Sequence, residues 1–247
     1  MMKVFYYSPT GGTKKVACAF QEGYDQSVMV DILTEDLPKT VCQKDDIVVA
    51  VCPVYSGRIP QVIHQRLQLL EGNGCASIVI GVYGNRAYDD ALLEMSDMMH
   101  KQGCRVVGAI GALAEHSLSR DVAKGRPNEK DCLQLQELRQ RILSSSLEDM
   151  SARIPGNNPY KVIKINDLCT APKATCQRCG ACASVCPQHI ISNIDFQVVD
   201  PQQCILCQAC IEACPTHDRQ NPAGYLETVK GKLSPLETVY KENELFL

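Results

Sequence analysis

The stretch CQRCGACASVCP at residues 176–187 recurs 28 residues later as CILCQACIEACP at residues 204–215. Each copy follows the pattern C-x2-C-x2-C-x3-C-P. Three closely spaced cysteines can wrap a tight loop around one iron–sulfur cubane, whereas the fourth has left that loop and reaches across to the other cluster. The repeat therefore predicts a small domain of two pseudo-symmetric halves that holds two [4Fe–4S] clusters.

Crossing ligation predicts a specific set of ligands for each cluster. The expected ligands of the first cluster are Cys176, Cys179, Cys182 and Cys214. The expected ligands of the second cluster are Cys204, Cys207, Cys210 and Cys186. Structural zinc also uses paired C-x2-C units, but a tetrahedral site has no use for three successive cysteines and a crossing fourth. His189 and His217 occupy matching places in the two copies, and we expect them at the surface or behind the ligands, because both sets of four are complete.

Fifteen cysteines in 247 residues need a chemical reason. A secreted disulfide scaffold would need a leader and a shorter chain, whereas this sequence begins MMKVFYY and runs directly into a strand pattern. The apolar run at residues 47–54 has the length of a strand and is too short to span a bilayer. We therefore expect a cytoplasmic protein in a reducing compartment, where clustered cysteines bind metal. The cysteines outside the repeat are expected mostly as small buried fillers.

The first 150 residues alternate short apolar runs with longer amphipathic segments. Strands are expected at residues 3–7, 27–33, 46–51, 76–83 and 105–112, and helices at residues 13–23, 60–70, 88–102 and 128–144. Such alternation, with nearly continuous apolar strands, predicts a parallel sheet covered by helices on both faces. The expected domains are residues 1–145 and 166–225. A linker at 146–165, rich in Ser, Pro, Gly and Asn, joins them, and a tail at 226–247 follows the second domain.

A phosphate site is expected where the first strand meets the first helix. The segment SPTGGT at residues 8–13 combines three hydroxyl side chains with two glycines. Exposed amides at a helix start attract an anion, the hydroxyls add donors, and the glycines allow close approach. The loop is neither G-x-G-x-x-G nor a Walker loop. An ordinary Ser/Thr helix cap with a turn is the alternative interpretation.

Two further loops follow neighbouring strands. CPVYSGRIP at residues 52–60 comes after the third strand, and YGNRAY at residues 83–88 comes after the fourth. In a doubly wound sheet, ligands bind at the carboxyl ends of the strands near the switch point. Tyrosines there could stack on a flat ring, and Asn85 or backbone amides could bond its polar edge. Each tyrosine could equally be an ordinary amphipathic residue of the rim.

The segment YSPTGGT at residues 7–13 is similar to the flavodoxin phosphate loop, T/S-x-T-G-x-T. From residue 3 to about 225, the chain resembles flavodoxin–ferredoxin fusion proteins of anaerobic bacteria. The resemblance implies an α/β, flavodoxin-like, doubly wound parallel sheet of order 2-1-3-4-5 that binds FMN noncovalently, followed by a small α+β two-cluster ferredoxin domain. By this match, the FMN phosphate is held by Ser8, Thr10, Gly11, Gly12 and Thr13. The flavin ring is bordered by Pro53, Val54, Tyr55, Ser56, Gly57, Tyr83, Gly84, Asn85 and Arg86. The chain has no tryptophan, so Tyr55, Tyr83 or Tyr88 must take the stacking place.

Two other residues lie at the expected rim. His116, after the fifth strand, could donate to the flavin ring or to a substrate. Alternatively, it could close its own loop or face the second domain. Cys52 could be redox-active, but buried packing is the favoured interpretation.

These features favour an electron-transfer protein that passes low-potential electrons between the clusters, FMN and partner enzymes acting as donor and acceptor. The alternative is an FMN-dependent reductase of a small organic substrate, fed by the clusters. The net charge of −3 gives no reason to expect nucleic-acid binding, and no membrane binding is expected. Two clusters would add about −4 and a flavin phosphate roughly −2, so the loaded protein suits basic patches on redox partners.

Overall fold

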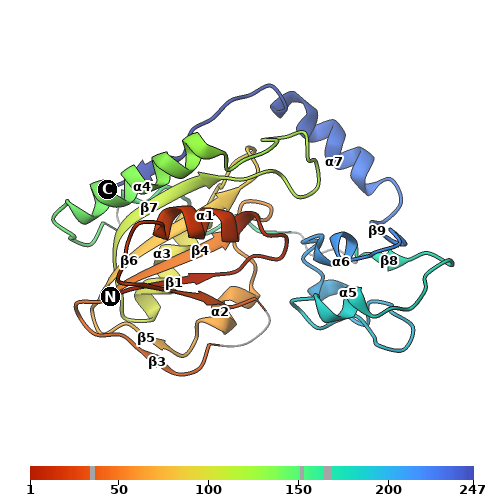
Figure 1. Cartoon of the computed structure of the whole chain (residues 1–247), viewed down its shortest axis with the longest axis horizontal. Coiled ribbons are helices and arrows are strands. Elements are labelled where there is room, and N and C mark those ends of the chain that lie inside the picture. Colours follow the sequence, from red (N-terminus) through yellow and green to blue (C-terminus); the bar gives the residue numbers. More distant parts are fainter. Residues whose placement is uncertain (34–36, 151–152, 164–167) are drawn as a thin grey trace.

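The computed structural model of the chain describes residues 1–33, 37–150, 153–163 and 168–247. Figure 1 shows a larger α/β part and a smaller part with little regular structure. Residues 151–152 and 164–165 of the expected linker lie outside the described residues, as do residues 166–167 at the start of the expected second domain. None of the helices in the described ranges combines the length and the hydropathy that a bilayer crossing requires.

A six-stranded sheet of order β10-β7-β6-β4-β1-β2 forms the centre of the larger part. Its five parallel strands are β1 (Met2–Tyr6), β2 (Ser27–Asp31), β4 (Ile47–Pro53), β6 (Ala76–Tyr83) and β7 (Arg105–Leu113). All of β6 and all but the first residue of β4 and of β7 are buried, as parallel strands covered on both faces require. In sequence order these five strands have the expected arrangement 2-1-3-4-5, so the predicted flavodoxin-like fold is confirmed.

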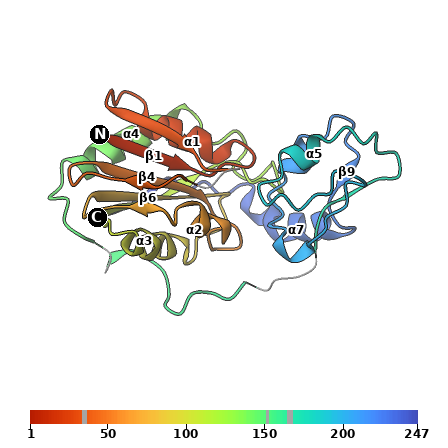
Figure 2. The ribbon, with the colours of Figure 1, turned by 90° about the horizontal axis from the view of Figure 1, so that it is seen from below.

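Helices cover both faces of this sheet (Figure 2). One face carries α1 (Gly12–Gln21) and α4 (Glu129–Leu143), and the other carries α2 (Val62–Arg66) and α3 (Ala91–Lys101). Val4 and Phe5 of β1 belong to opposite clusters of the core, as the two-residue period of a strand dictates. Asn128 caps α4 in a capping box with Asp131, which confirms the expected helix start. The helix expected at residues 60–70 is shorter, because Leu70 and Glu71 form β5 (Leu70–Glu71), paired with β3 (Thr40–Val41).

The smaller part is built on the cysteine repeat. α5 (Ala181–Ser184) and α6 (Ala209–Glu212) occupy the same place in the two copies, and each is preceded by a residue with positive φ, Gly180 at 82° and Gln208 at 72°. Antiparallel pairing of β8 (Ala171–Pro172) with β9 (Arg219–Gln220) brings the two ends of this part together. A short 3-10 turn, η2 (Pro201–Gln203), leads into the second copy. The described structure therefore has the pseudo-symmetry that the repeat predicts.

The segment expected as a tail returns to the sheet. It contains α7 (Tyr225–Leu233), η3 (Ser234–Leu236) and β10 (Glu244–Phe246), which pairs antiparallel with β7. Figure 1 shows this segment running from the smaller part back to the far edge of the sheet. A three-residue edge strand has too few positions for a detectable period, which is why the sequence did not predict it.

The connecting segment at residues 153–163 packs along α3 on its way to the smaller part. Asp90 accepts hydrogen bonds from the backbone N–H groups of Asn157 (2.8 Å) and Lys161 (2.6 Å). Tyr160 donates to Asp97, and the Arg58 guanidinium lies 4.5 Å from the centre of the Tyr160 ring. These contacts give the connector a defined path over the larger part.

Candidate functional site

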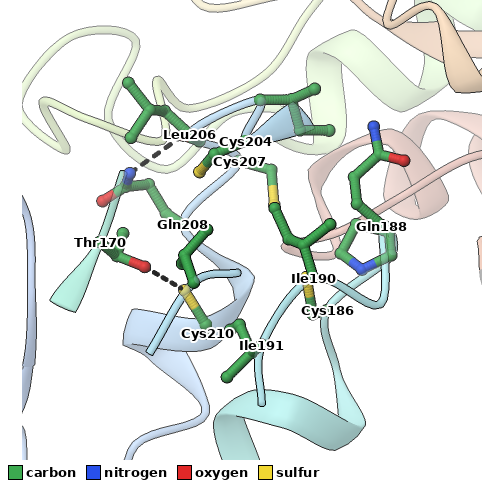
Figure 3. A pocket seen from close by; sticks show the side chains of 13 residues that line it. Thr170, Cys186, Gln188, Ile190, Ile191, Cys204, Leu206, Cys207, Gln208 and Cys210 are labelled. Atoms are coloured by element: carbon green, nitrogen blue, oxygen red, sulfur yellow. Dashed lines mark hydrogen bonds between the residues drawn. The ribbon is translucent and has the colours of Figure 1, made fainter. Parts of the chain in front are cut away.

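Two open cavities in the smaller part divide the cysteines of the repeat between them. One cavity is lined by Cys186, Cys204, Cys207 and Cys210 (Figure 3). The other is lined by Cys176, Cys179, Cys182 and Cys214. Each cavity combines three cysteines of one copy with the fourth cysteine of the other copy. This is the grouping that crossing ligation predicts.

The thiols of each cavity stand apart around a hollow. Among the residues that the structure describes, no three His, Cys, Asp or Glu side chains approach one another as ligands of a single metal ion would. A cubane presents a separate iron to each cysteine, so it needs a hollow walled by thiols rather than a point of convergence. In the cavity that contains Cys207, apolar side chains complete the wall, namely those of Ile190, Ile191 and Val198. The donor set of each cavity, four cysteine thiols, fits a [4Fe–4S] cluster.

The pKa values of the thiols in the two cavities are shifted in different directions. Burial raises the pKa of Cys207 to about 12, so iron must supply the driving force for its deprotonation. Burial also acts to raise the pKa of Cys214, but backbone N–H groups of Arg219, Asp218 and Thr216 and the Thr216 hydroxyl outweigh it and lower that pKa. Hydrogen bonds to ligating sulfurs are among the protein's means of setting a cluster's potential. The two cavities therefore offer different electrostatic surroundings.

The phosphate loop joins β1 to α1 and keeps donors open. Gly11, at the N-cap position of α1, adopts φ 83°, a left-handed conformation that glycine tolerates. Having no side chain, Gly11 cannot accept a hydrogen bond from the first N–H groups of the helix as Ser or Asp would. The Ser8 hydroxyl accepts the N–H of Lys14 at 2.9 Å, so part of the ordinary cap interpretation applies to Ser8. Within the described ranges, the N–H groups of Gly12 and Thr13 have no acceptor. These donors at a helix start fit a phosphate group.

The rim of the sheet holds polar atoms that fit a ring with a polar edge. Tyr7 Oη, Tyr83 Oη and Asn85 Oδ1 are buried and have no hydrogen-bond partner among the described residues. Unpaired buried polar atoms are costly, so a group that supplies donors and acceptors is expected there. Asn85 Nδ2 is already engaged, because it donates to the carbonyl oxygens of Leu236 (3.2 Å) and Val239 (2.7 Å).

The three candidate stacking tyrosines have different surroundings. Tyr88 donates to Glu244 at 2.7 Å, and its ring meets Tyr83 and Phe246 edge to face. Its side chain thus packs against the C-terminal strand. Tyr55 is half-buried in the loop after β4. Burial raises its pKa, and the nearby Cys207 of the smaller part and Tyr7 raise it further. Of the three, Tyr55 has the position best suited to a ring held between the two parts.

Two family models match the chain: "Flavodoxin" over residues 4–125 and "4Fe-4S dicluster domain" over residues 169–215. The chain joins a flavodoxin domain to a 4Fe–4S dicluster domain. The predicted resemblance to flavodoxin–ferredoxin fusion proteins is thereby confirmed. The pair of domains makes the chain an electron-transfer protein that uses FMN and at least one [4Fe–4S] cluster.

Solved structures resemble the flavodoxin domain at low identity. An archaeal flavodoxin is 17% identical with a TM-score of 0.41, covering 57% of this chain and 94% of that one. Two-electron reduced flavodoxin from Megasphaera elsdenii is 17% identical with a TM-score of 0.39, covering 57% and 99%. An apo NADH:FMN oxidoreductase is 18% identical with a TM-score of 0.41, covering 61% and 94%. No curated protein matches the chain.

The dicluster domain lies against the carboxyl ends of the flavodoxin strands (Figures 1 and 2). Arg66 at the end of α2 donates to the carbonyl oxygen of Pro187 at 3.2 Å. Ile205 packs against the core cluster that contains Tyr7, and Arg120 forms an ion pair with Glu212. Burial raises the pKa of Tyr7, and the nearby Cys207 and Cys186 add to the shift. The rim of the flavodoxin domain and the cavity lined by Cys207 therefore adjoin.

His116 closes its own loop in the flavodoxin domain. Its Nδ1 accepts the N–H of Leu118 at 3.1 Å, which leaves the ring proton on Nε2. The ring lies against Gly84, where an added Cβ would come within 2.6 Å of it. Burial lowers the pKa of His116 to about 4, and Arg86 and Arg120 act in the same direction. The imidazole is therefore neutral at physiological pH.

This geometry predicts a pH-dependent stability. The folded pKa of about 4 lies below the ordinary value of 6.5, so stability is complete above pH 6.5 and falls as pH drops towards 4. Between pH 7 and 5.5, the wild type should lose about 1 kcal/mol that His116→Gln does not lose. Thermal unfolding of both proteins at several pH values measures the difference. Parallel pH profiles for the two proteins would contradict the assignment.

Sequence reasoning missed four residues that shape the site. Tyr7 was expected as the end of a strand and the first residue of the phosphate-loop match, and Arg66 as part of a helix. Thr170 and Arg219 lie outside the two copies of the cysteine repeat. The sequence contained one signal. At the interval of 28 residues that relates the two copies, Arg219 is equivalent to Ile191, so a cation and an apolar residue occupy matching positions.

Proposed function

We propose that this chain is an electron carrier in which one noncovalent FMN and two [4Fe–4S] clusters exchange electrons directly, while donor and acceptor are separate redox proteins. The supporting observation is the contact between the two domains at the rim of the flavodoxin domain, where Arg66 donates to the Pro187 carbonyl oxygen at 3.2 Å and Ile205 packs against the core cluster that contains Tyr7. When bound, FMN supplies one- or two-electron chemistry and each cluster supplies one-electron chemistry. The free clustered thiols suit the cytoplasm.

The proposed ligand sets follow the two cavities. Cys186, Cys204, Cys207 and Cys210 hold the cluster next to the flavin, and Cys176, Cys179, Cys182 and Cys214 hold the distant one. For FMN, residues 8–13 bind the phosphate, while residues 53–57 and 83–86 border the ring with Tyr55 stacked on it. Tyr88 and His116 support the ring loops from behind.

The residues at the junction hold the two domains close together and transfer no proton. Ile205 packs against the core of the flavodoxin domain and excludes water, while Arg66 fixes the segment that follows Cys186. No proton relay is needed, and His116 keeps its Nδ1 in a local bond. At the other end, Cys179 is exposed, which makes its edge the proposed place of contact with an external partner.

Rapid anaerobic mixing tests the carrier proposal. A one-electron reductant is mixed with the loaded protein while flavin and cluster absorbance are followed separately. Cluster reduction followed by concentration-independent flavin reduction is expected. The proposal fails if the flavin stays oxidised while the clusters are reduced, or if turnover of a defined small organic substrate depends on His116. The second outcome would favour the reductase alternative.

Two complete sets of ligands require about eight iron and eight sulfide per chain. Iron and sulfide assays on anaerobically prepared protein, normalised to amino-acid analysis, provide the count. Four irons per chain, or stoichiometric zinc, would contradict the two-cluster assignment.

The phosphate loop gives a further prediction. Replacing both Thr10 and Thr13 with valine removes two hydroxyl donors to a dianion while keeping side-chain shape, so FMN affinity should fall at least tenfold. Fluorescence titration of the flavin-free protein measures the dissociation constant. Lys15→Ala, on an exposed position of the same helix, is the control. Undiminished affinity, or release of FAD on heating, would refute the site.

A further inference from the structure

Arg219 is a buried cation between the two cysteine cavities. It is 3% exposed and lines the cavity of Cys176, Cys179, Cys182 and Cys214. Its Nε donates to Thr170 Oγ1 at 2.9 Å and its Nη2 to the Thr170 carbonyl oxygen at 2.8 Å, while Nη1 donates to the Phe196 carbonyl. The guanidinium is thus held in a fixed orientation by its planar set of donors.

Thr170 links Arg219 to the other cavity, because its hydroxyl contacts both Arg219 and Cys210. It is 2% exposed and lines the cavity of Cys186, Cys204, Cys207 and Cys210, where its Oγ1 lies 3.2 Å from Cys210 Sγ (Figure 3). Because Oγ1 accepts from Arg219, its hydrogen is free to point at the sulfur. A thiolate can only accept, so the hydroxyl is the donor of that bond when iron is bound.

The charge of Arg219 is not neutralised by a carboxylate within the described part of the chain. Its acceptors there are three neutral oxygens, and none of the ion pairs formed between described residues includes it. A buried cation is costly unless negative charge lies near. Four thiolates around each cavity supply that charge, which accounts for the presence of an arginine here.

We propose that Arg219 is a positioning residue that raises the reduction potentials of both cluster sites, acting on one by its charge and on the other through the Thr170 hydroxyl. The inference rests on the proposed two-cluster function. Reduction adds one negative charge to a cluster, and a fixed cation or a hydrogen bond to a ligating sulfur stabilises the more negative state. Ile191 at the equivalent position of the first copy brings no charge, so one arginine serves both sites.

Four variants of the full-length loaded protein separate these two effects. Arg219→Gln removes the charge, and Arg219→Lys keeps the charge but loses the planar set of donors. Thr170→Val removes the hydroxyl with little change of shape, and Thr170→Ser restores it. The measurement is an anaerobic redox titration followed by electron paramagnetic resonance and absorbance. Iron is counted first, because eight irons per chain test the two-cluster proposal independently of the potentials.

The expected pattern is specific. Arg219→Gln should lower the ratio of reduced to oxidised protein at a fixed ambient potential roughly tenfold in both titration waves, or about 59 mV for a one-electron centre. In Thr170→Val, the ratio of reduced to oxidised protein at a fixed potential should fall about threefold in one wave and stay unchanged in the other. Thr170→Ser should restore that wave, and Arg219→Lys should restore only the wave that Thr170→Val leaves unchanged.

Unchanged potentials in Arg219→Gln with eight irons would overturn the inference and leave the two-cluster proposal intact. If Arg219→Gln does not hold iron, the Thr170 pair decides. A Thr170→Val protein with eight irons and wild-type potentials, or a shift that Thr170→Ser does not reverse, would equally overturn it.

Discussion

Cys186→Ser is expected to remove roughly half of the iron, and to remove it from the site built mainly by the other copy of the repeat. Cys186 belongs to the first copy in sequence but lines the cavity of Cys204, Cys207 and Cys210. Because this cavity adjoins Tyr7 and Tyr55, reduction of the flavin through the clusters should be lost as well. Iron assay and the rapid-mixing experiment measure the two effects.

Matched variants make the result specific. Cys204→Ser should produce the same spectrum and the same loss of flavin reduction as Cys186→Ser, while Cys182→Ser should instead resemble Cys214→Ser. Cys169→Ser, outside the repeat, should keep all the iron. If Cys186→Ser matched Cys182→Ser, ligation would be local to each copy and the crossing assignment would fail.

The parallel sheet could be predicted because its signal is local and strong. β4, β6 and β7 are long runs of Val, Ile and Ala, buried on both faces, and the intervening helices carry their own periodicity. The C-terminal strand lacked such a signal. Its register, Leu245 opposite Ile110, depends on the completed sheet, and a three-residue segment contains no information about that partner.

The grouping of the cysteines into two cavities could be predicted for a different reason. It depends on the spacing of the cysteines in each copy of the repeat, and the proposed cluster ligands follow from that spacing. Arg219 and Thr170 could not be found in this way, because their contact joins residues 49 positions apart through β8 and β9. Tyr55 could be placed at the rim, but choosing it over Tyr88 required Glu244 and Phe246, which come from the returning strand.

Removing residues 234–247 is the second change with a large expected effect. The segment supplies the ladder of β10 to β7, and Asn243 Oδ1 accepts the N–H of Leu113 at 2.9 Å. Its backbone also holds Asn85 through Leu236 and Val239. The free energy of unfolding should fall by on the order of 5 kcal/mol, and FMN should bind more weakly because the loop of Asn85, which we propose borders the ring, loses its support.

The truncation should also slow electron transfer between the domains. The dicluster domain is tied to the flavodoxin domain by the connector before it and by the segment after it, so two attachments restrict its position, and effective concentration falls when one of them is removed. We expect intramolecular flavin reduction at least tenfold slower, measured by rapid mixing on protein with full iron and FMN content.

Asn243→Ala is the milder test of the same attachment. It leaves the buried N–H of Leu113 without its acceptor, which costs about 1–3 kcal/mol, while the chain still spans both domains. It should therefore lower stability and leave the transfer rate close to that of the wild type. A truncated protein that transfers electrons at the wild-type rate would show that Arg66–Pro187 and the packing of Ile205 suffice to hold the junction. In that case the returning strand would serve stability alone.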